Sequence, residues 1–382
     1  VAQMFQRIWG FVKRHRKKFI FSAVFFGGGY VAWRVLLPRL MRHLMERALK
    51  SVEEEGGLEK LLGLAVEGDE ESRKQAEELK KRQDFEHKQQ VSDKHVRKSL
   101  DAINARHTPS FSVDECTAKL SEAKTKEEKL KCLEAIQAEC LARTASAVYT
   151  LEILLLLHRV EFNIVGREIA AASSAGKKFV ADGSAVSDED AEAQAEFLAS
   201  THYVQEEGLK QLASSVRSAV KACSAKSGLG PSTPVTAESL QRFFNDVFRE
   251  TNTELLTSGK GAATLLPESL DAQVKQQEKV KHLLNEARDY LDSPQFVDVF
   301  QAVSSGAAEH LAASLGDGAA DPASALLAGG KSCPMAKLFG PLIQNSQATL
   351  SCDDRGGFVA RFAKEEKVTR LCEALYFEDS KS

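Results

Sequence analysis

Several features that mark common protein classes are absent from this 382-residue chain or scarce in it. Its seven cysteines are odd in number and include no CxxC pair, which excludes a disulfide-rich scaffold and favours a reducing compartment. Proline is scarce, at nine residues, and charged residues make up 27% of the chain, so a collagen-like protein and a multi-spanning membrane protein are both excluded. The length still leaves ample chain for a sizeable hydrophobic core.

Motifs that carry chemistry are also absent. The sequence contains no GxxxxGK[ST] loop, GxGxxG turn, GxSxG elbow or HExxH helix. The nine histidines are not paired with cysteines at zinc-ligand spacing. His87 and His95 lie in a charged segment, where a solvated helix face is a better interpretation than a metal site. We therefore expect no enzymatic activity, no cofactor and no bound metal.

Acidic residues are missing from the first part of the chain. Residues 1–45 hold nine Lys and Arg and no acid, whereas residues 46–382 hold 42 basic against 54 acidic residues, a net charge of −12. A surface that binds nucleic acid needs clustered cations, and residues 46–382 are acidic overall. We therefore expect no nucleic-acid partner. Two physically different pieces meet near residue 45.

The basic piece contains one candidate membrane anchor. Residues 19–33 carry no charge, but as a helix they rise only about 22 Å, short of a hydrocarbon core of roughly 30 Å. If Arg34 snorkels, residues 19–37 are long enough to span. We predict a basic segment at residues 1–18 and a membrane anchor at residues 19–37. The anchor residues are Phe19, Phe21, Phe25, Gly28, Tyr30 and Trp33, and a targeting role falls to Lys13, Arg14, Arg16, Lys17 and Lys18.

This segment has two other interpretations, a signal peptide and an ordinary core helix. A signal peptide would be followed by a small-residue cleavage site, which is missing, and an ordinary core helix would rarely tolerate three consecutive glycines at 27–29. The orientation stays open from these residues alone. The excess of Lys and Arg before the anchor places the N-terminus in the cytosol, whereas the cysteines favour the cytosol for residues 46–382.

Beyond residue 38 the apolar residues recur with helical spacing. We predict an all-α fold, a single large helical bundle over residues 38–382 with a long central helix, preceded by the N-terminal membrane-anchor helix. The central helix is residues 143–170, the most hydrophobic part of the body, and residues 39–104 are predicted to form long solvated helices. No hairpin pattern predicts a sheet. Linkers are predicted at residues 171–187, 224–236 and 304–331.

Helix starts are indicated by capping patterns. Ser112 with Glu115, and Thr125 with Glu128, have the spacing of a capping box, in which a hydroxyl and a carboxylate each accept a free backbone amide. Ser293 before Pro294 predicts a third start, because proline is favoured at the first helical position. The acidic run at 187–190 predicts a fourth.

Separate blocks in order along the chain resemble the peroxin-3 family. The N-terminal block runs from Trp9 to Tyr30, and a second block runs from Ala147 to Gly166. Residues 283–296, with Leu283, Leu284, Asn285, Glu286, Ala287, Arg288, Asp289, Leu291, Ser293, Pro294 and Phe296, form the most specific block. Residues 334–337 and the pattern from Phe358 to Tyr376 extend the resemblance to the C-terminus.

The resemblance implies a function and a site. Members of this family are helical bundles on the peroxisomal or endoplasmic reticulum membrane that face the cytosol, and they dock the N-terminal amphipathic helix of peroxin-19, the import receptor for peroxisomal membrane proteins. It implies a partner groove formed by Leu120, Lys129, Leu133, Ile136 and Lys337. The family often has a large aromatic anchor where this chain has Leu133. Without the resemblance, the three apolar residues of this set would be read as ordinary core.

A second functional interpretation comes from another class. The long charged segment at residues 39–104 could serve an organelle tether or adaptor that links peroxisomes to cytoskeletal or inheritance factors. Retention of a peroxin-19-like protein on purification would favour the docking receptor over the tether.

Overall fold

The computed structural model describes residues 70–174, 188–257, 265–267, 278–316, 322–355 and 357–377. The predicted basic segment (1–18), membrane anchor (19–37) and domain boundary at residue 38 lie outside them. The chain divides into two compact units, Val1–Lys81 and Arg82–Ser382. Of the first unit only Glu70–Lys81, the start of helix α5, is described. The account below concerns the second unit.

The predicted all-α class is confirmed, and the elements follow one another in this order. The first half of the chain contains α5 (Glu70–His107), η2 (Thr108–Ser110), α6 (Val113–Glu122), α7 (Lys126–Ser174), α8 (Asp188–Ala199), α9 (Thr201–Tyr203), η3 (Val204–Gly208) and α10 (Leu209–Ser227). The second half contains β1 (Pro234–Val235), α11 (Ala237–Asn252), η4 (Thr253–Thr257), α13 (Glu278–Leu291), α14 (Pro294–Gly316), α15 (Pro322–Ala328), β2 (Cys333–Pro334), η5 (Met335–Leu338), α16 (Phe339–Thr349), α17 (Phe358–Phe362) and α18 (Glu366–Phe377).

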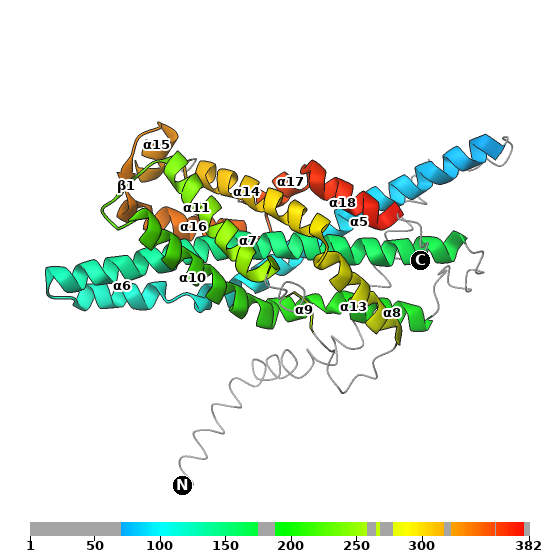
Figure 1. Cartoon of the computed structure of the whole chain (residues 1–382), viewed down its shortest axis with the longest axis horizontal. Helices are drawn as coiled ribbons and strands as arrows, with labels where there is room; N and C mark the ends of the chain where they lie inside the picture. Colours follow the sequence, from blue (N-terminus) through cyan, green and yellow to red (C-terminus); the bar gives the residue numbers. More distant parts are fainter. Residues whose placement is uncertain are drawn as a thin grey trace, which may run out of the picture. The chain divides into compact units, whose positions relative to one another are not determined.

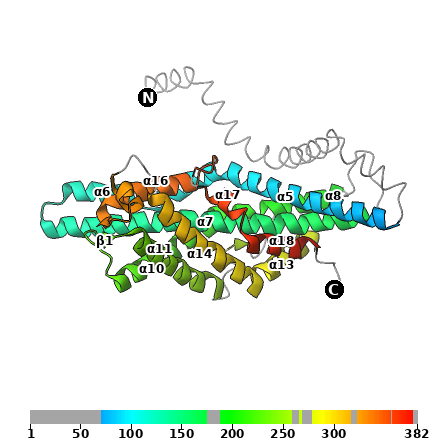
Figure 2. The same ribbon diagram turned by 90° about the horizontal axis from the view of Figure 1, so that it is seen from above.

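Helix α7 is the central helix that the sequence predicts, and it is longer than predicted at both ends. Every residue from Cys140 to Glu161 is buried, because α6, α10, α16 and α18 all pack against it. In Figure 2, α7 lies between α5 and α16 on one side and α10, α11, α13 and α14 on the other. Among the described residues, one stretch, Lys126–Ala172, is long and apolar enough to cross a membrane. Its apolar part is entirely covered by neighbouring helices, as in the core of a soluble bundle.

The prediction that residues 39–104 form solvated helices is wrong for the part of α5 that follows Arg82, because this part packs against α7. From Arg82 onward it runs antiparallel to α7, since Gln89 Nε2 donates to Asn163 Oδ1 (2.7 Å) and Arg143 Nη2 donates to Thr108 Oγ1 (3.2 Å). Four apolar side chains of this charged helix are buried: Phe85, Val96, Leu100 and Ile103. Their spacing forms a narrow stripe on one face, and the charges between them occupy the rest of the surface.

The predicted linker at residues 304–331 is wrong. Helix α14 continues to Gly316, and α15 occupies Pro322–Ala328. Alanine is the strongest helix former, and its small side chain lets helices approach closely, so Ala307, Ala308 and Ala312 are buried in the packed core. The linkers predicted at 171–187 and 224–236 begin later than expected, because α7 extends to Ser174 and α10 to Ser227.

Helices begin at all four predicted starts, with α6 at Val113, α7 at Lys126, α8 at Asp188 and α14 at Pro294, but one of the two predicted capping boxes is wrong. Thr125 and Glu128 form the reciprocal capping box, with Glu128 N donating to Thr125 Oγ1 (3.1 Å) and Thr125 N to Glu128 Oε2 (3.0 Å). Phe296 N donates to Ser293 Oγ (3.1 Å) at the start of α14. Ser112 is the N-cap residue of α6, but its side chain caps no amide, and its own amide donates to Glu139 Oε2 of α7 (3.1 Å).

The described residues include one short antiparallel ribbon that the sequence did not predict. Strand β1 pairs with β2 in the register Val235↔Cys333 and Pro234↔Pro334. Two further amides extend the pairing, from Met335 N to Thr233 O (3.0 Å) and from Ala336 N to Pro231 O (2.9 Å). The ribbon fixes η5 beside the loop that follows α10.

Candidate functional site

Helices α6 and α7 form an antiparallel hairpin at one end of the bundle (Figure 1). The turn between them is short, and the Thr125–Glu128 capping box starts α7 there. The base of the hairpin is held by Glu139 of α7, which accepts from Ser112 N and from Arg217 Nε (3.1 Å) of α10. The guanidinium of Arg217 also lies over the Phe111 ring, 4.7 Å from its centroid. These contacts fix the angle at which α6 leaves the bundle.

The structure places the five predicted partner-binding residues at different depths. Ile136 is 5% exposed and belongs to the hydrophobic core. Leu120 of α6 and Leu133 of α7 are half-buried, and Lys129 and Lys337 are exposed. The interpretation of these apolar residues as ordinary core therefore holds for Ile136, while Leu120 and Leu133 keep part of their apolar surface in solvent. That these residues form a partner groove stays a prediction.

Lys337 reaches this region from a distant part of the sequence. It lies on η5, which packs against α7 and is paired through the ribbon with the loop after α10. That loop is attached to the hairpin helix, since Gln137 Nε2 donates to Leu229 O (2.8 Å). The fold thus brings η5 next to the part of α7 that carries Leu133 and Ile136.

One apolar residue at this end was missed by the sequence analysis. Leu130 is 47% exposed, and it lies three positions before Leu133, so the two side chains are neighbours along α7. The sequence does contain a signal for Leu130, namely its spacing of three residues from Leu133. This spacing extends the row of partly exposed leucines toward the tip of the hairpin. We call Leu120, Leu130 and Leu133, with Lys129 and Lys337, the hairpin surface.

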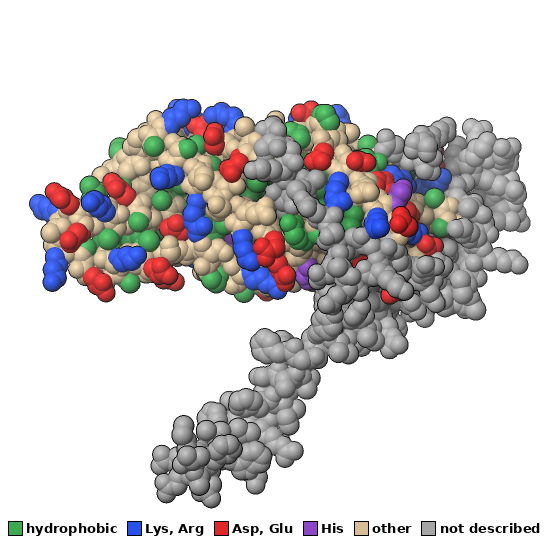
Figure 3. Space-filling model, turned by 60° about the horizontal axis from the view of Figure 1, so that its bottom comes forward, with side chains coloured by type: hydrophobic (Ala, Val, Ile, Leu, Met, Phe, Trp, Pro, Cys, Tyr) green, Lys and Arg blue, Asp and Glu red, His purple; other side chains and the backbone are tan. Residues whose placement is uncertain are grey.

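The tip of the hairpin differs in charge from the rest of the body. Residues 119–131 contain five lysines and three glutamates, a net charge of +2, while residues 46–382 as a whole carry −12. Figure 3 shows charged side chains of both signs at this end, with apolar side chains between them. The carboxylate of Glu128 is already used by the capping box, and the backbone amides of Thr125 and Lys124 lower its pKa. The tip therefore favours an acidic partner.

Nothing in this part of the structure indicates covalent or metal chemistry. Burial raises the pKa of the Cys140 thiol to about 12, so it is not a reactive nucleophile. Within the described residues, no group of three or more His, Cys, Asp and Glu side chains could hold a metal ion. The hairpin surface is suited to contacts with another protein rather than to catalysis.

Comparison with known proteins places this fold in a family. The sequence matches the family model described as Peroxin-3 over residues 45–352. It is 24% identical over 313 residues to the peroxisomal biogenesis factor 3 of Bos taurus, which covers 78% of this chain and 75% of the bovine protein. The family match includes α5, the hairpin, the central helix and η5. The chain belongs to the peroxin-3 family of non-enzymatic peroxisome biogenesis factors.

Proposed function

We propose that the protein is a membrane-anchored docking receptor for peroxin-19, required for the insertion of peroxisomal membrane proteins, and that its hairpin surface binds the amphipathic helix of that partner. The observation that carries the proposal is the set of partly exposed leucines, Leu120, Leu130 and Leu133, beside the exposed Lys129 and Lys337. Apolar side chains from two helices, flanked by cations, suit an amphipathic helix with an acidic edge.

The chemistry of the surface indicates how such a helix would be held. Half-buried leucines can lose further apolar area to a partner, at roughly 25 cal/mol per Å². The exposed lysines add long-range attraction that raises the association rate more than the affinity. Leucine in place of an aromatic anchor at position 133 offers less contact area, so we expect the partner helix to fill that space with a larger side chain of its own.

The proposed location is the peroxisomal membrane, with the bundle in the cytosol. Residues 19–37 would provide the anchor, and a reducing cytosol suits the cysteines of the bundle. The tether interpretation loses some of its support, because it relied on a free charged helix. From Arg82 onward that helix packs on α7 through its buried apolar stripe.

A matched set of aspartate substitutions tests the docking proposal. We expect Leu133→Asp to weaken binding of the peroxin-19 N-terminal peptide by at least about 30-fold, because a charge would be buried against an apolar helix, at a cost of about 2 kcal/mol or more. Its melting temperature should stay near that of the parent protein, since the side chain is half-exposed in the free protein. Leu79→Asp is the control, because Leu79 is 53% exposed and lies outside the hairpin.

Two further variants sharpen the result. Ile136→Asp should lower the melting temperature strongly, because this side chain belongs to the core. Lys337→Ala should weaken binding only a few-fold, and less at high salt, as a rim charge does. Unchanged peptide affinity of Leu133→Asp together with a collapsed melting temperature would refute the groove.

A further inference from the structure

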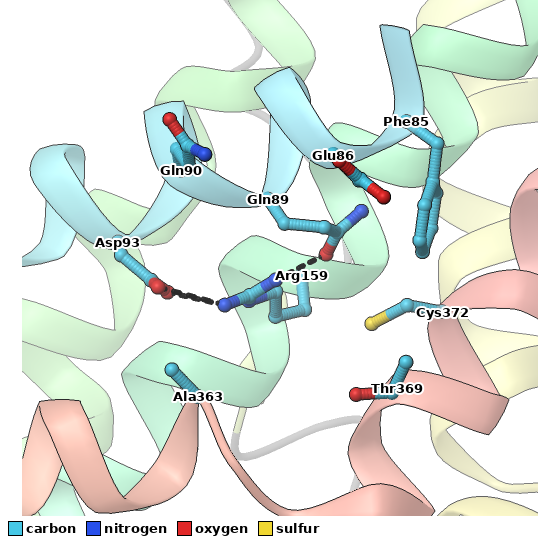
Figure 4. A pocket seen from close by; sticks show the side chains of 9 residues that line it. All are labelled: Phe85, Glu86, Gln89, Gln90, Asp93, Arg159, Ala363, Thr369 and Cys372. Atoms are coloured by element: carbon cyan, nitrogen blue, oxygen red, sulfur yellow. Dashed lines mark hydrogen bonds and ion pairs between the residues drawn. The ribbon is translucent and has the colours of Figure 1, made fainter. Parts of the chain in front are cut away.

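A polar hollow of about 300 Å³ lies away from the hairpin surface, between α5, α7 and the α17–α18 segment (Figure 4). Helix α5 contributes most of its lining and α7 contributes Arg159. The lining residues are Phe85, Glu86, Gln89, Gln90, Asp93, Arg159, Ala363, Thr369 and Cys372. None of the residues assigned to the hairpin surface belongs to it.

The hollow lies between α5 and the segment from the loop before α17 to α18. Ion pairs link the two segments on either side of the hollow, and small side chains line the space between these pairs. Arg82 of α5 pairs with Glu373 of α18 (3.5 Å), and Arg97 of α5 pairs with Asp354 in the loop before α17 (3.4 Å). Between these pairs the opposite wall presents the short side chains of Ala363, Thr369 and Cys372.

The floor of the hollow is a buried ion pair. The Arg159 side chain is 7% exposed, and its Nη2 donates to both oxygens of Asp93 (2.7 and 2.8 Å). Its Nη1 donates to Gln89 Oε1, as the dashed line in Figure 4 shows. The positive charge of Arg159 is thus neutralised by Asp93 inside the hollow.

The remaining charge in the hollow is negative. Glu86 is exposed at the rim, so the lining contains two carboxylates and one guanidinium. An anionic group would be repelled by Glu86 and Asp93, and a purely apolar group would desolvate them without replacing their hydrogen bonds. A cation would be attracted by this net negative charge, which comes from Glu86 because Asp93 and Arg159 offset each other. Burial of Asp93 outweighs its bonds to Arg159 and raises its pKa, so further positive charge would stabilise the carboxylate.

We propose that this hollow is a socket for a lysine or arginine side chain on a partner protein, with its charged end between Glu86 and Asp93. The buried Phe85 ring in the wall offers an apolar surface to the aliphatic stem of such a side chain. At about 300 Å³, the hollow has room for one long side chain and is too small for a helix. The socket is therefore a second, separate contact site, and it does not depend on the function proposed for the hairpin surface.

Short peptides test the socket on the full chain in neutral detergent micelles. The probes are acetyl-Gly-Ala-Xaa-Ala-Gly-amides in which the central residue is arginine, lysine, norleucine or glutamate, and binding is measured by saturation-transfer NMR. We expect the arginine and lysine peptides to bind saturably and the norleucine and glutamate peptides not to bind. Glu86→Gln should weaken binding at least about threefold, the loss expected for a partly exposed ion pair. Glu127→Gln, an exposed substitution at the hairpin, is the matched control and should change nothing.

A second variant fills the hollow without changing its charge. Ala363 is exposed at the rim, so Ala363→Trp should fold normally, which its melting curve checks, and should abolish binding of the basic peptides. The proposal is overturned if the arginine and lysine peptides do not bind, if the glutamate peptide binds equally well, or if neither variant changes the affinity. Loss of binding in Leu133→Asp would also overturn it, because the hairpin surface shares no residue with the socket.

Discussion

At the scale of single residues, two carboxyl groups in the middle of α7 stand out because they are fully buried. Glu152 Oε2 accepts from Ser304 Oγ of α14 (3.0 Å), and Glu161 Oε1 accepts from Ser200 Oγ (3.1 Å). Burial raises the pKa of Glu152 to about 8 and that of Glu161 well above its ordinary value. The folded protein therefore keeps protons on these groups at pH values where the unfolded chain has lost them.

This proton binding makes stability depend on pH. The unfolded Glu152 ionises near pH 4.5, while the folded one holds its proton to about pH 8, so the free energy of unfolding should fall with rising pH between these values. The slope is at most about 1.4 kcal/mol per pH unit for one group. We expect Glu152→Gln to flatten this decline, as measured by urea unfolding at pH 5 and pH 8. Glu127→Gln, on the surface, should leave the slope unchanged, and equal slopes in both variants would contradict the assignment.

At the scale of elements, helix starts show what could be predicted from local sequence and what could not. The pattern at Thr125 and Glu128 predicted a capping box correctly, because both partners lie within one turn of chain. The similar pattern at Ser112 predicted the start of α6 correctly, but it forms no capping box, because the Ser112 amide donates to Glu139, 27 residues later. The second half of α14, from Ser304 to Gly316, contradicts the predicted linker, because small residues favour both loops and close helix packing. Local patterns do not show which tertiary partner competes for a group.

The two capping sites make a matched pair for substitution. Thr125→Ala should destabilise the first turn of α7 by about 1 kcal/mol, because it leaves the Glu128 amide without its hydroxyl acceptor. Ser112→Ala should have little effect, since its side chain makes no cap. Hydrogen exchange checks both: the amide of Glu128 should exchange about fivefold faster in Thr125→Ala, whereas the amide of Glu115, three residues after Ser112, should exchange at the parent rate in Ser112→Ala. Equal effects in the two variants would contradict this account.

The candidate site was predictable only in part, because local sequence spacing does not show which tertiary neighbours cover a residue. Helical spacing placed Leu133 and Ile136 on one face, but spacing does not show how far neighbouring elements cover that face. Ile136 belongs to the hydrophobic core and Leu133, on the same face, is only half-buried, a difference that spacing along α7 does not predict. Leu130 is not among the positions that the resemblance implies, although its spacing from Leu133 places it on the same side of α7.

At the scale of the whole molecule, the anchor and the bundle are predicted to be separable. A fragment of residues 38–382 should be released from membranes and retain a helical circular dichroism spectrum, because the bundle of the second unit has a continuous hydrophobic core of its own. Sedimentation of membranes followed by circular dichroism of the supernatant measures both. An aggregated fragment without helical signal would contradict the prediction.

The orientation can be tested on the intact protein. Protease added to intact peroxisomes should digest the bundle if residues 46–382 face the cytosol, as the cysteine content favours. Detergent-treated peroxisomes are the control for protease access. A fully protected bundle would reverse the orientation.

The antiparallel pairing of α5 with α7 has a mechanical consequence. The hairpin surface lies near the start of α7, whereas the N-terminal end of the packed part of α5 lies beside the far half of α7, at Asn163. From Leu133 to Arg159 the helix rises about 39 Å. A force that pulls on the hairpin, as the proposed partner would exert, while the chain before α5 is held would slide these two helices along each other in opposite directions. Under such a shear load, all the contacts between α5 and α7 bear the force at the same time, including Asp93–Arg159 and Gln89–Asn163. A force that peeled the helices apart would instead break these contacts one after another.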